Sequence, residues 1–298
     1  MIAAAAKAGA DAVKFQTFHA EELVLDSVEH FGLVKNCELS SEDHLRLAQV
    51  ARANGVTFIS TPFDARAVSI LEQAGVPAFK IASMDVTNLP LLRVVARTRK
   101  PVILSTGMAS LAEVAEAVET ISAAGNDQTI LLHCVSKYPT EPHEANLPLI
   151  PYLRDTFALP VGWSDHTLGN AVSLAAVAIG AGVIEKHFTL DKNLPGPDHA
   201  LSADPAELAA LVNDVRRIEK ALSPCGTLIS RSDRDNARIF RRGIHAAGDI
   251  PAGTIITAEM LRCVRPEEGL SPRHLDLIIG RSARKAIARN QALTAEDV

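Results

Sequence analysis

Short apolar runs and amphipathic stretches alternate seven times along this chain, and the alternation constrains the fold more than any other feature. The runs have the length of buried strands, and the stretches have the three-and-four apolar spacing of helices. The expected strands are 11–16, 56–61, 78–82, 101–105, 129–133, 161–164 and 183–187. The expected helices are 41–54, 65–74, 89–98, 111–124, 148–157, 170–179 and 205–222. A helix between successive strands predicts a parallel sheet of βα units.

The fold class that suits seven such units is a (β/α)8 barrel with one strand unaccounted for. An open doubly wound sheet would more often carry a glycine-rich phosphate turn after its first strand, and none follows residues 11–16. Residues 1–9 have the pattern of a helix end that runs into that strand. We therefore expect a TIM barrel that lacks its first strand in this chain and exposes two unpaired sheet edges.

A change of pattern after residue 222 predicts a second domain. Residues 223–239 are polar and charged, which is typical of a linker. Residues 240–298 alternate short strands with turns, and the expected strands there are 243–247, 249–254, 261–265 and 285–288. The expected organisation is a barrel over 1–222, a linker, and a small β-rich domain that is too short to be very stable alone.

Composition excludes several classes of protein. A net charge of -5 gives no basic stripe for nucleic acid, and no apolar run reaches the length of a membrane span. The first residues lack the basic leader of a signal peptide, so a cytoplasmic location is expected. Cys37, Cys134, Cys225 and Cys263 form no CxxC pair, which predicts reduced, structural thiols rather than disulfides or a zinc site.

Polar side chains close nearly every apolar run, and in a TIM barrel the strand ends form the active-site rim. These side chains are Lys14, Gln16, Ser60, Thr61, Lys80, Ser83, Ser105, Thr106, His133, Ser136, Ser164, His166, Glu185 and His187. Any one of these side chains alone is more often a solvated or capping residue. Their convergence, however, predicts a site for an anion, with a divalent-metal site beside it on His166 and His187. We also expect 105–107 to open a helix whose free N–H groups bind the anion.

The motifs at these positions resemble those of the sialic acid synthase family, in the same order, from about Ala5 to the C-terminus. They are Lys14-Phe-Gln-Thr-Phe18, Ser60-Thr-Pro-Phe63, Phe79-Lys-Ile-Ala-Ser83, Leu104-Ser-Thr-Gly-Met108, His133-Cys-Val-Ser-Lys-Tyr-Pro139, Gly162-Trp-Ser-Asp-His-Thr167, Glu185-Lys-His-Phe188 and Gly196-Pro-Asp198. The last domain, with Ile250-Pro-Ala-Gly253, Arg265-Pro266 and Ile279-Gly-Arg281, resembles the antifreeze-like domain that follows the barrel in that family.

The resemblance implies a metal-dependent transferase that condenses phosphoenolpyruvate with an open-chain N-acetylated hexosamine, such as N-acetylmannosamine. The products would be a nine-carbon, sialic acid-type 2-keto acid and phosphate. His166, His187 and Lys80 would be catalytic, with Mn²⁺ or Mg²⁺ on the two histidines. Lys14, Thr61, Lys80, Ser83, Ser105 and Ser164 would bind phosphoenolpyruvate, with Ser136 nearby. Tyr138, Asp198 and Arg265 would bind the sugar, and Arg265 would come from the partner in a domain-swapped homodimer.

Two departures from the family pattern bear on activity. The family's first strand carries a glutamate that transfers a proton, and this chain begins after that point. If these residues were the whole protein, we would expect badly impaired catalysis, and equal phosphate release with and without an upstream extension would contradict this. Ser136 replaces the asparagine of several members that make N-acetylneuraminate, so the hexosamine stays open. The alternatives are a Schiff-base keto-acid aldolase acting through Lys80, or a non-catalytic carbohydrate- or ice-binding module.

Overall fold

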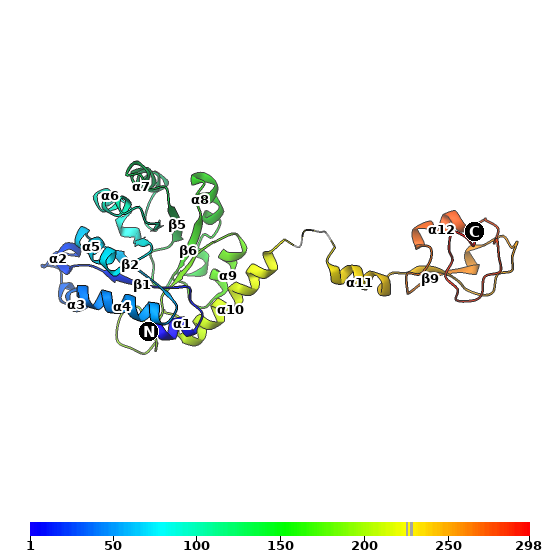
Figure 1. The fold of residues 1–298 in the computed structure, drawn as a ribbon, viewed down its shortest axis with the longest axis horizontal. Helices are drawn as coiled ribbons and strands as arrows, with labels where there is room; N and C mark the ends of the chain where they lie inside the picture. The colour runs from blue at the N-terminus through cyan, green and yellow to red at the C-terminus, as the bar shows by residue number, and fades with distance from the viewer. Residues whose placement is uncertain (225, 227–228) are drawn as a thin grey trace. The chain divides into compact units, whose positions relative to one another are not determined.

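The computed structural model describes residues 1–224, 226 and 229–298, and these divide into two compact units, Met1–Leu222 and Ser223–Val298 (Figure 1). Of the cysteines for which a reduced thiol is expected, Cys37, Cys134 and Cys263 are free, and Cys225 lies outside the described residues. No helix among the described residues is long and apolar enough to cross a membrane.

A seven-stranded parallel sheet forms the centre of the first unit, and its strands lie in the order of the sequence. The strands are β1 (Ala12–Thr17), β2 (Thr57–Pro62), β3 (Phe79–Ile81), β4 (Val102–Ser105), β5 (Thr129–Cys134), β6 (Val161–Asp165) and β7 (Ile184–Lys186). In the described part of the chain β1 pairs with β2 alone and β7 with β6 alone, which leaves two open edges. The predicted TIM-like barrel with an open sheet is confirmed.

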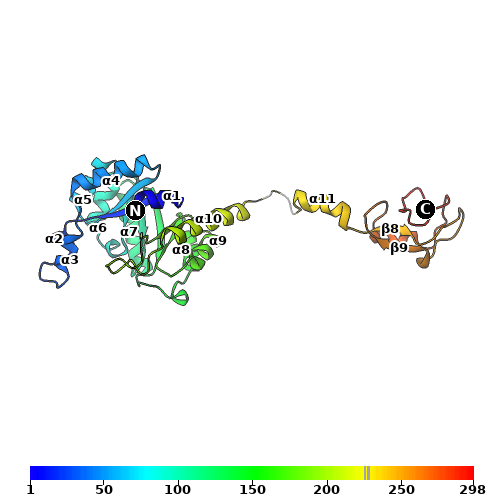
Figure 2. The same cartoon turned by 90° about the horizontal axis from the view of Figure 1, so that it is seen from below.

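Most helices of this unit lie around the outside of the sheet, whereas the two short helices that follow β1 project beyond it (Figures 1 and 2). The helices are α1 (Ile2–Lys7), α2 (Ala20–Leu23), α3 (Phe31–Asn36), α4 (Ser41–Ala53), α5 (Ala65–Ala74), α6 (Leu89–Arg97), α7 (Leu111–Ala123), α8 (Leu149–Phe157), α9 (Ala171–Ala178) and α10 (Pro205–Leu222), with short 3-10 turns at Ser83–Asp85 and Pro142–Glu144. The two short helices α2 and α3 were not predicted. Ser40 starts α4 with a capping box, and Gly75 ends α5 at a φ of 73°.

The helical layer continues across the side where the sheet is open. α10 packs against both α9 and α1, and α1 packs against α4. Arg216 of α10 makes two 2.6 Å hydrogen bonds to the Asp11 carboxylate, just before β1. The core lies between the sheet and the helices, and its large side chains Phe79, Leu104, Leu131 and Trp163 are fully buried. The outer layer therefore holds β1 and β7 on neighbouring sides of one rim although they do not pair.

The second unit is small and mainly irregular, around an antiparallel pair formed by β8 (Gly243–Ala246) and β9 (Leu261–Val264). Its other elements are α11 (Arg231–Phe240), α12 (Leu275–Ile278) and the 3-10 turns Ala258–Met260 and Pro272–His274. The expected strands at 249–254 and 285–288 reduce to a bridge between Ile250 and Ile287, because Pro251 and the turn at Gly253 interrupt the first. Helix α11 occupies much of 223–239, where a linker is expected.

Candidate active site

The carboxylate of Glu185 lies at the centre of a charged cluster at the carboxyl end of the sheet. Its Oε1 accepts a 3.0 Å hydrogen bond from Ser164 Oγ. The same oxygen lies 3.9 Å from Lys14 Nζ and 3.9 Å from Lys80 Nζ. Ser164 and Glu185 are neighbours in the β6–β7 register, whereas Lys14 reaches Glu185 across the two open sheet edges. The cluster thus joins β1, β3, β6 and β7 at one point.

Burial and mutual charge decide the protonation of this cluster. The pKa of Lys80 is lowered to about 8, chiefly by burial and to a smaller extent by the charge of Lys14, while the charge of Glu185 opposes the shift. Burial alone would raise the pKa of Glu185, but Lys14, Lys80 and Ser164 hold it below its usual range. Lys80 also donates hydrogen bonds to Ile81 O at 2.9 Å and Ser105 Oγ at 2.7 Å. Near neutral pH two ammonium groups face one carboxylate, which leaves a net positive charge suited to an anion.

Hydroxyl groups from neighbouring strand ends surround the lysines. Gly107 N donates to Ser83 Oγ at 3.0 Å. A Cβ at Gly107 would lie 2.5 Å from Ser136 Oγ and 2.8 Å from Ser83 Oγ, so these two serines meet at a glycine that no larger residue can replace without movement. The buried Cys134 Sγ lies 4.0 Å from His166 Nδ1, and burial raises the pKa of the Cys134 thiol. Ser105 and Thr61 are also buried, at the ends of β4 and β2.

The prediction that 105–107 open an anion-binding helix is wrong. Helix α7 begins at Leu111, and Ser110 with Glu113 forms a capping box that engages the N–H groups of Ser110 and Glu113. Thr106 N already donates to Leu132 O at 3.0 Å, and Gly107 N is engaged by Ser83. Since the N–H groups of Thr106 and Gly107 already have acceptors within the protein, they are not free to bind an anion in the way that a helix N-terminus does.

His166 and His187 lie beside the cluster with ring centroids 5.3 Å apart. His166 Nδ1 donates to Val135 O at 2.7 Å; because a carbonyl can only accept, Nε2 keeps its lone pair. His187 Nδ1 lies 3.4 Å from Asp198 Oδ2. Burial lowers the pKa of both imidazoles, and for His187 the charge of Asp198 opposes this shift. Both rings are therefore neutral near pH 7.

This donor set fits a divalent metal that takes two ligands from the protein. Metal-ligating histidines use one ring nitrogen for the metal and donate the other N–H to an oxygen acceptor. His166 does this with Val135 O, and the Asp198 carboxylate lies 3.4 Å from His187 Nδ1. Among the described residues no group of three or more His, Cys, Asp or Glu side chains is placed to hold a metal ion. The other ligands would be oxygen atoms of water or substrate.

The side chains predicted for the sugar lie at the solvent side of the histidines or in the other unit. The Tyr138 ring lies 4.1 Å from the His166 ring and 5.7 Å from the His187 ring, with half of the residue exposed. Burial raises the pKa of Tyr138 to about 12, so its hydroxyl stays a donor. Asp198 is half exposed beside His187. Arg265 belongs to the second unit, where its guanidinium lies 5.3 Å from the centre of the Phe240 ring.

Two strand-end residues behave differently from the sequence expectation. His133 Nε2 donates to Ala145 O at 2.8 Å and its ring packs 5.0 Å from that of Trp163, so it belongs to the layer behind the sheet rather than to the cluster. Glu185 is one of the polar residues that close the apolar runs, and no role is predicted for it from the sequence. Its spacing of two from His187 was the available signal, because alternate residues of a strand share a face.

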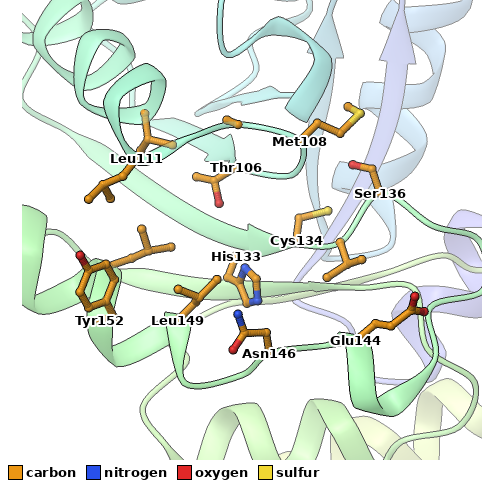
Figure 3. A pocket seen from close by; sticks show the side chains of 14 residues that line it. Thr106, Met108, Leu111, His133, Cys134, Ser136, Glu144, Asn146, Leu149 and Tyr152 are labelled. Carbon is orange, nitrogen blue, oxygen red and sulfur yellow. The ribbon is translucent and has the colours of Figure 1, made fainter.

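A pocket of about 470 Å³ adjoins this rim between the ends of β4 and β5 and helices α7 and α8 (Figure 3). Its wall is mostly apolar, with Met108, Leu111 and Leu149, and it also includes Tyr152 and Asn146. Cys134 and Ser136 also line this pocket, on the side that faces the serine hydroxyl groups near Gly107. None of the cluster lysines or histidines lines it, so the chemistry lies beside this pocket rather than within it.

Comparison with known proteins agrees with this geometry. Residues 1–225 match the NeuB family, and residues 241–298 match the SAF domain. An uncharacterized protein of Methanocaldococcus jannaschii is 46% identical over 284 residues, covering 95% of this chain and 84% of that protein. The N,N'-diacetyllegionaminic acid synthase of Campylobacter jejuni is 40% identical over 301 residues, covering 96% of this chain and 90% of that protein. The crystal structure of N-acetylneuraminic acid synthetase from Leptospira borgpetersenii is similar at a TM-score of 0.75 and 40% identity, covering 79% of this chain and 82% of that one.

Proposed function

This chain belongs to the NeuB family, and on that premise we propose that it is a nonulosonic acid synthase. In the proposed reaction, phosphoenolpyruvate condenses with the open-chain aldehyde of an N-acetylated hexosamine, releasing phosphate and forming a nine-carbon 2-keto sugar acid. The observation that carries the proposal is the pair Lys14 and Lys80, each 3.9 Å from Glu185, beside two neutral imidazoles. Such a site has charge for an enol phosphate and ligands for a metal on one rim.

Side chains of the cluster hold and activate the enol phosphate. Lys14 and Lys80 neutralise its phosphate and carboxylate, and Thr61, Ser83, Ser105, Ser136 and Ser164 supply hydrogen bonds. The same two cations stabilise phosphate as it departs, when its charge is largest. A divalent ion such as Mn²⁺ or Mg²⁺, held by His166 and His187, would supply Lewis-acid polarisation of the aldehyde oxygen.

In this proposal Glu185 transfers a proton from water to the aldehyde oxygen. C3 of the enol bonds to the aldehyde carbon, water adds its oxygen to C2, and the bond from C2 to the phosphate oxygen breaks. One proton of the water passes through the ionised Glu185 to the former aldehyde oxygen, and the other leaves with phosphate. The position of Glu185 between Ser164 and the lysines supports this role, because its lowered pKa keeps it a proton acceptor at neutral pH.

The test is phosphate release and product mass with phosphoenolpyruvate and a panel of N-acetylated hexosamines, with protein and substrates at equal concentration so that slow turnover is detected. We expect equal amounts of phosphate and a product with the mass of hexosamine plus pyruvate. A chelator should abolish the reaction and added Mn²⁺ should restore it. Absence of any such product would overturn the proposal.

A Schiff-base aldolase remains a second candidate because the pKa of Lys80 is lowered to about 8 by burial. An aldolase would consume pyruvate rather than phosphoenolpyruvate and would work in chelator. Borohydride with pyruvate would then attach a three-carbon group to Lys80, detectable by peptide mass. In a synthase the same treatment leaves Lys80 unmodified, and this single measurement separates the two candidates.

Because Lys80 loses its proton at alkaline pH, we expect kcat/KM for phosphoenolpyruvate to fall there. Its pKa is lowered to about 8, so above that pH one of the two cations is lost and affinity for an anion falls. We expect kcat/KM for phosphoenolpyruvate to be level below about pH 8 and to fall up to about tenfold per pH unit above it. A profile that stays level to about pH 10 would contradict a role for the Lys80 charge.

For the sugar side we propose contacts from Tyr138, Asp198 and Arg265, with Arg265 supplied by a second copy of the chain in a swapped homodimer. Arg265→Ala is then expected to raise KM for the hexosamine about tenfold or more, the usual cost of a charged hydrogen bond, and to leave KM for phosphoenolpyruvate unchanged. Arg273→Ala, in the same unit, is the control. A monomeric mass in light scattering, or an equal rise in both KM values, would contradict the proposal.

A further inference from the structure

A buried ion pair lies directly behind the two histidines. Lys186 Nζ donates to Asp165 Oδ2 at 2.8 Å, and their side chains are 5% and 0% exposed. Asp165 immediately precedes His166, and Lys186 immediately precedes His187. Because successive side chains of a strand point to opposite faces, the ion pair occupies the helix side of the sheet while the imidazoles occupy the rim.

The pair is the centre of a network that holds the chain on both sides of His166. Asp165 Oδ1 accepts hydrogen bonds from Thr167 N at 2.8 Å and Thr167 Oγ1 at 2.7 Å. Asp165 Oδ2 also accepts from Ser173 Oγ of α9 at 2.6 Å. Lys186 Nζ donates a second hydrogen bond to Thr167 O at 2.7 Å. One ammonium group thus connects the strand of His187 to the residues before and after His166.

Strand β7 needs such a connection more than the other strands do. It has three residues, Ile184–Lys186, and pairs with β6 alone among the described strands. Asp165 and Lys186 are partners in that register, as are Ser164 and Glu185. A slip of one residue would turn Glu185 and His187 away from the rim, and the ion pair opposes this slip from the other face.

We propose that Asp165 and Lys186 are positioning residues that fix the orientation of His166 and His187 as a pair. The identity of the metal held by the imidazoles rests on the proposed function, but their alignment is a property of the chain itself. Stability alone is a weak reason for the pair, because buried ion pairs often contribute little net free energy compared with apolar residues of the same volume.

The test compares Lys186→Met with Lys192→Met, which removes the partly exposed ion pair to Glu207 at 2.6 Å. The metal-free readout is the ¹⁵N spectrum of the imidazoles at one pH, where wild type should show His166 protonated at Nδ1. The second readout is Mn²⁺ affinity, measured from the electron paramagnetic resonance signal of free Mn²⁺. For Lys186→Met we expect altered signals from both histidines and affinity lower by about 10- to 100-fold. Lys192→Met should match wild type in both.

Each outcome decides the proposal. Wild-type imidazole signals in a folded Lys186→Met protein would overturn it. If that variant fails to fold, the double variant Asp165→Asn with Lys186→Met removes the unpaired charge, and the same spectrum then supports or overturns positioning. If wild type binds no Mn²⁺, the metal part of the proposed function fails, while the imidazole spectrum still decides whether Asp165 and Lys186 align the rings.

Discussion

Replacing Lys80 by methionine is expected to lower kcat/KM for phosphoenolpyruvate by about 10²- to 10³-fold, the usual effect of removing one charge-stabilising donor from a buried site. Lys80 Nζ lies 3.9 Å from Glu185 and donates to Ser105 Oγ at 2.7 Å, in a position with almost no exposure to water. Coulombic attraction is strongest where water is excluded, so solvent cannot replace this charge. Methionine fills a similar volume and leaves the surrounding packing in place.

The measurement is steady-state phosphate release, with circular dichroism to show that the variant is folded. Lys7→Met is the matched control, because Lys7 is an exposed lysine in α1 and should leave kcat/KM unchanged. The loss should appear for every hexosamine tested, since Lys80 acts on the enol phosphate. Activity within a few-fold of wild type in a folded Lys80→Met protein would refute the assigned role.

Gly162→Ala is expected to destabilise the first unit by about 3 kcal/mol or more, at or above the upper end of ordinary overpacking. A Cβ at this position in β6 would lie 2.4 Å from Val183 O and 2.7 Å from Leu132 Cδ2. Val183 O accepts the hydrogen bond of Trp163 N, so the carbonyl cannot move away without breaking the link to β7. The strain therefore falls on the strand pair β6 and β7, which His166 and His187 directly follow.

Gly182→Ala is the matched control for this prediction. Gly182 lies just before β7 and also contacts β6, but its Cβ would lie 3.9 Å from Val161 O, an ordinary contact. Thermal unfolding followed by circular dichroism should show a clear loss of Tm for Gly162→Ala and little change for Gly182→Ala. Equal Tm values for the two variants would show that the β6–β7 approach is not as close as the structure has it.

Local sequence predicted the elements well because each one is specified by its own residues. All seven strands lie within one residue of the expected ranges, and α5 and α10 match their expected bounds. Spacing also placed Lys14, Lys80, His166 and His187 on one rim, because the carboxyl ends of parallel strands meet there. The prediction that 105–107 open an anion-binding helix failed for a local reason too, since the capping box of Ser110 and Glu113 starts α7 at Leu111, where the apolar spacing of 111–124 also places it.

The sequence by itself determined the alternation of strands and helices, the second unit, and the residue types that reach the rim, since periodicity and turn chemistry are local properties. Only the tertiary structure decided that Glu185 joins Lys14 and Lys80, that His133 packs on Trp163, and that Asp165 and Lys186 pair behind the histidines. These facts depend on distances between separate strands. The lowered pKa of Lys80 likewise depends on burial by residues far away in the chain, which no local pattern records.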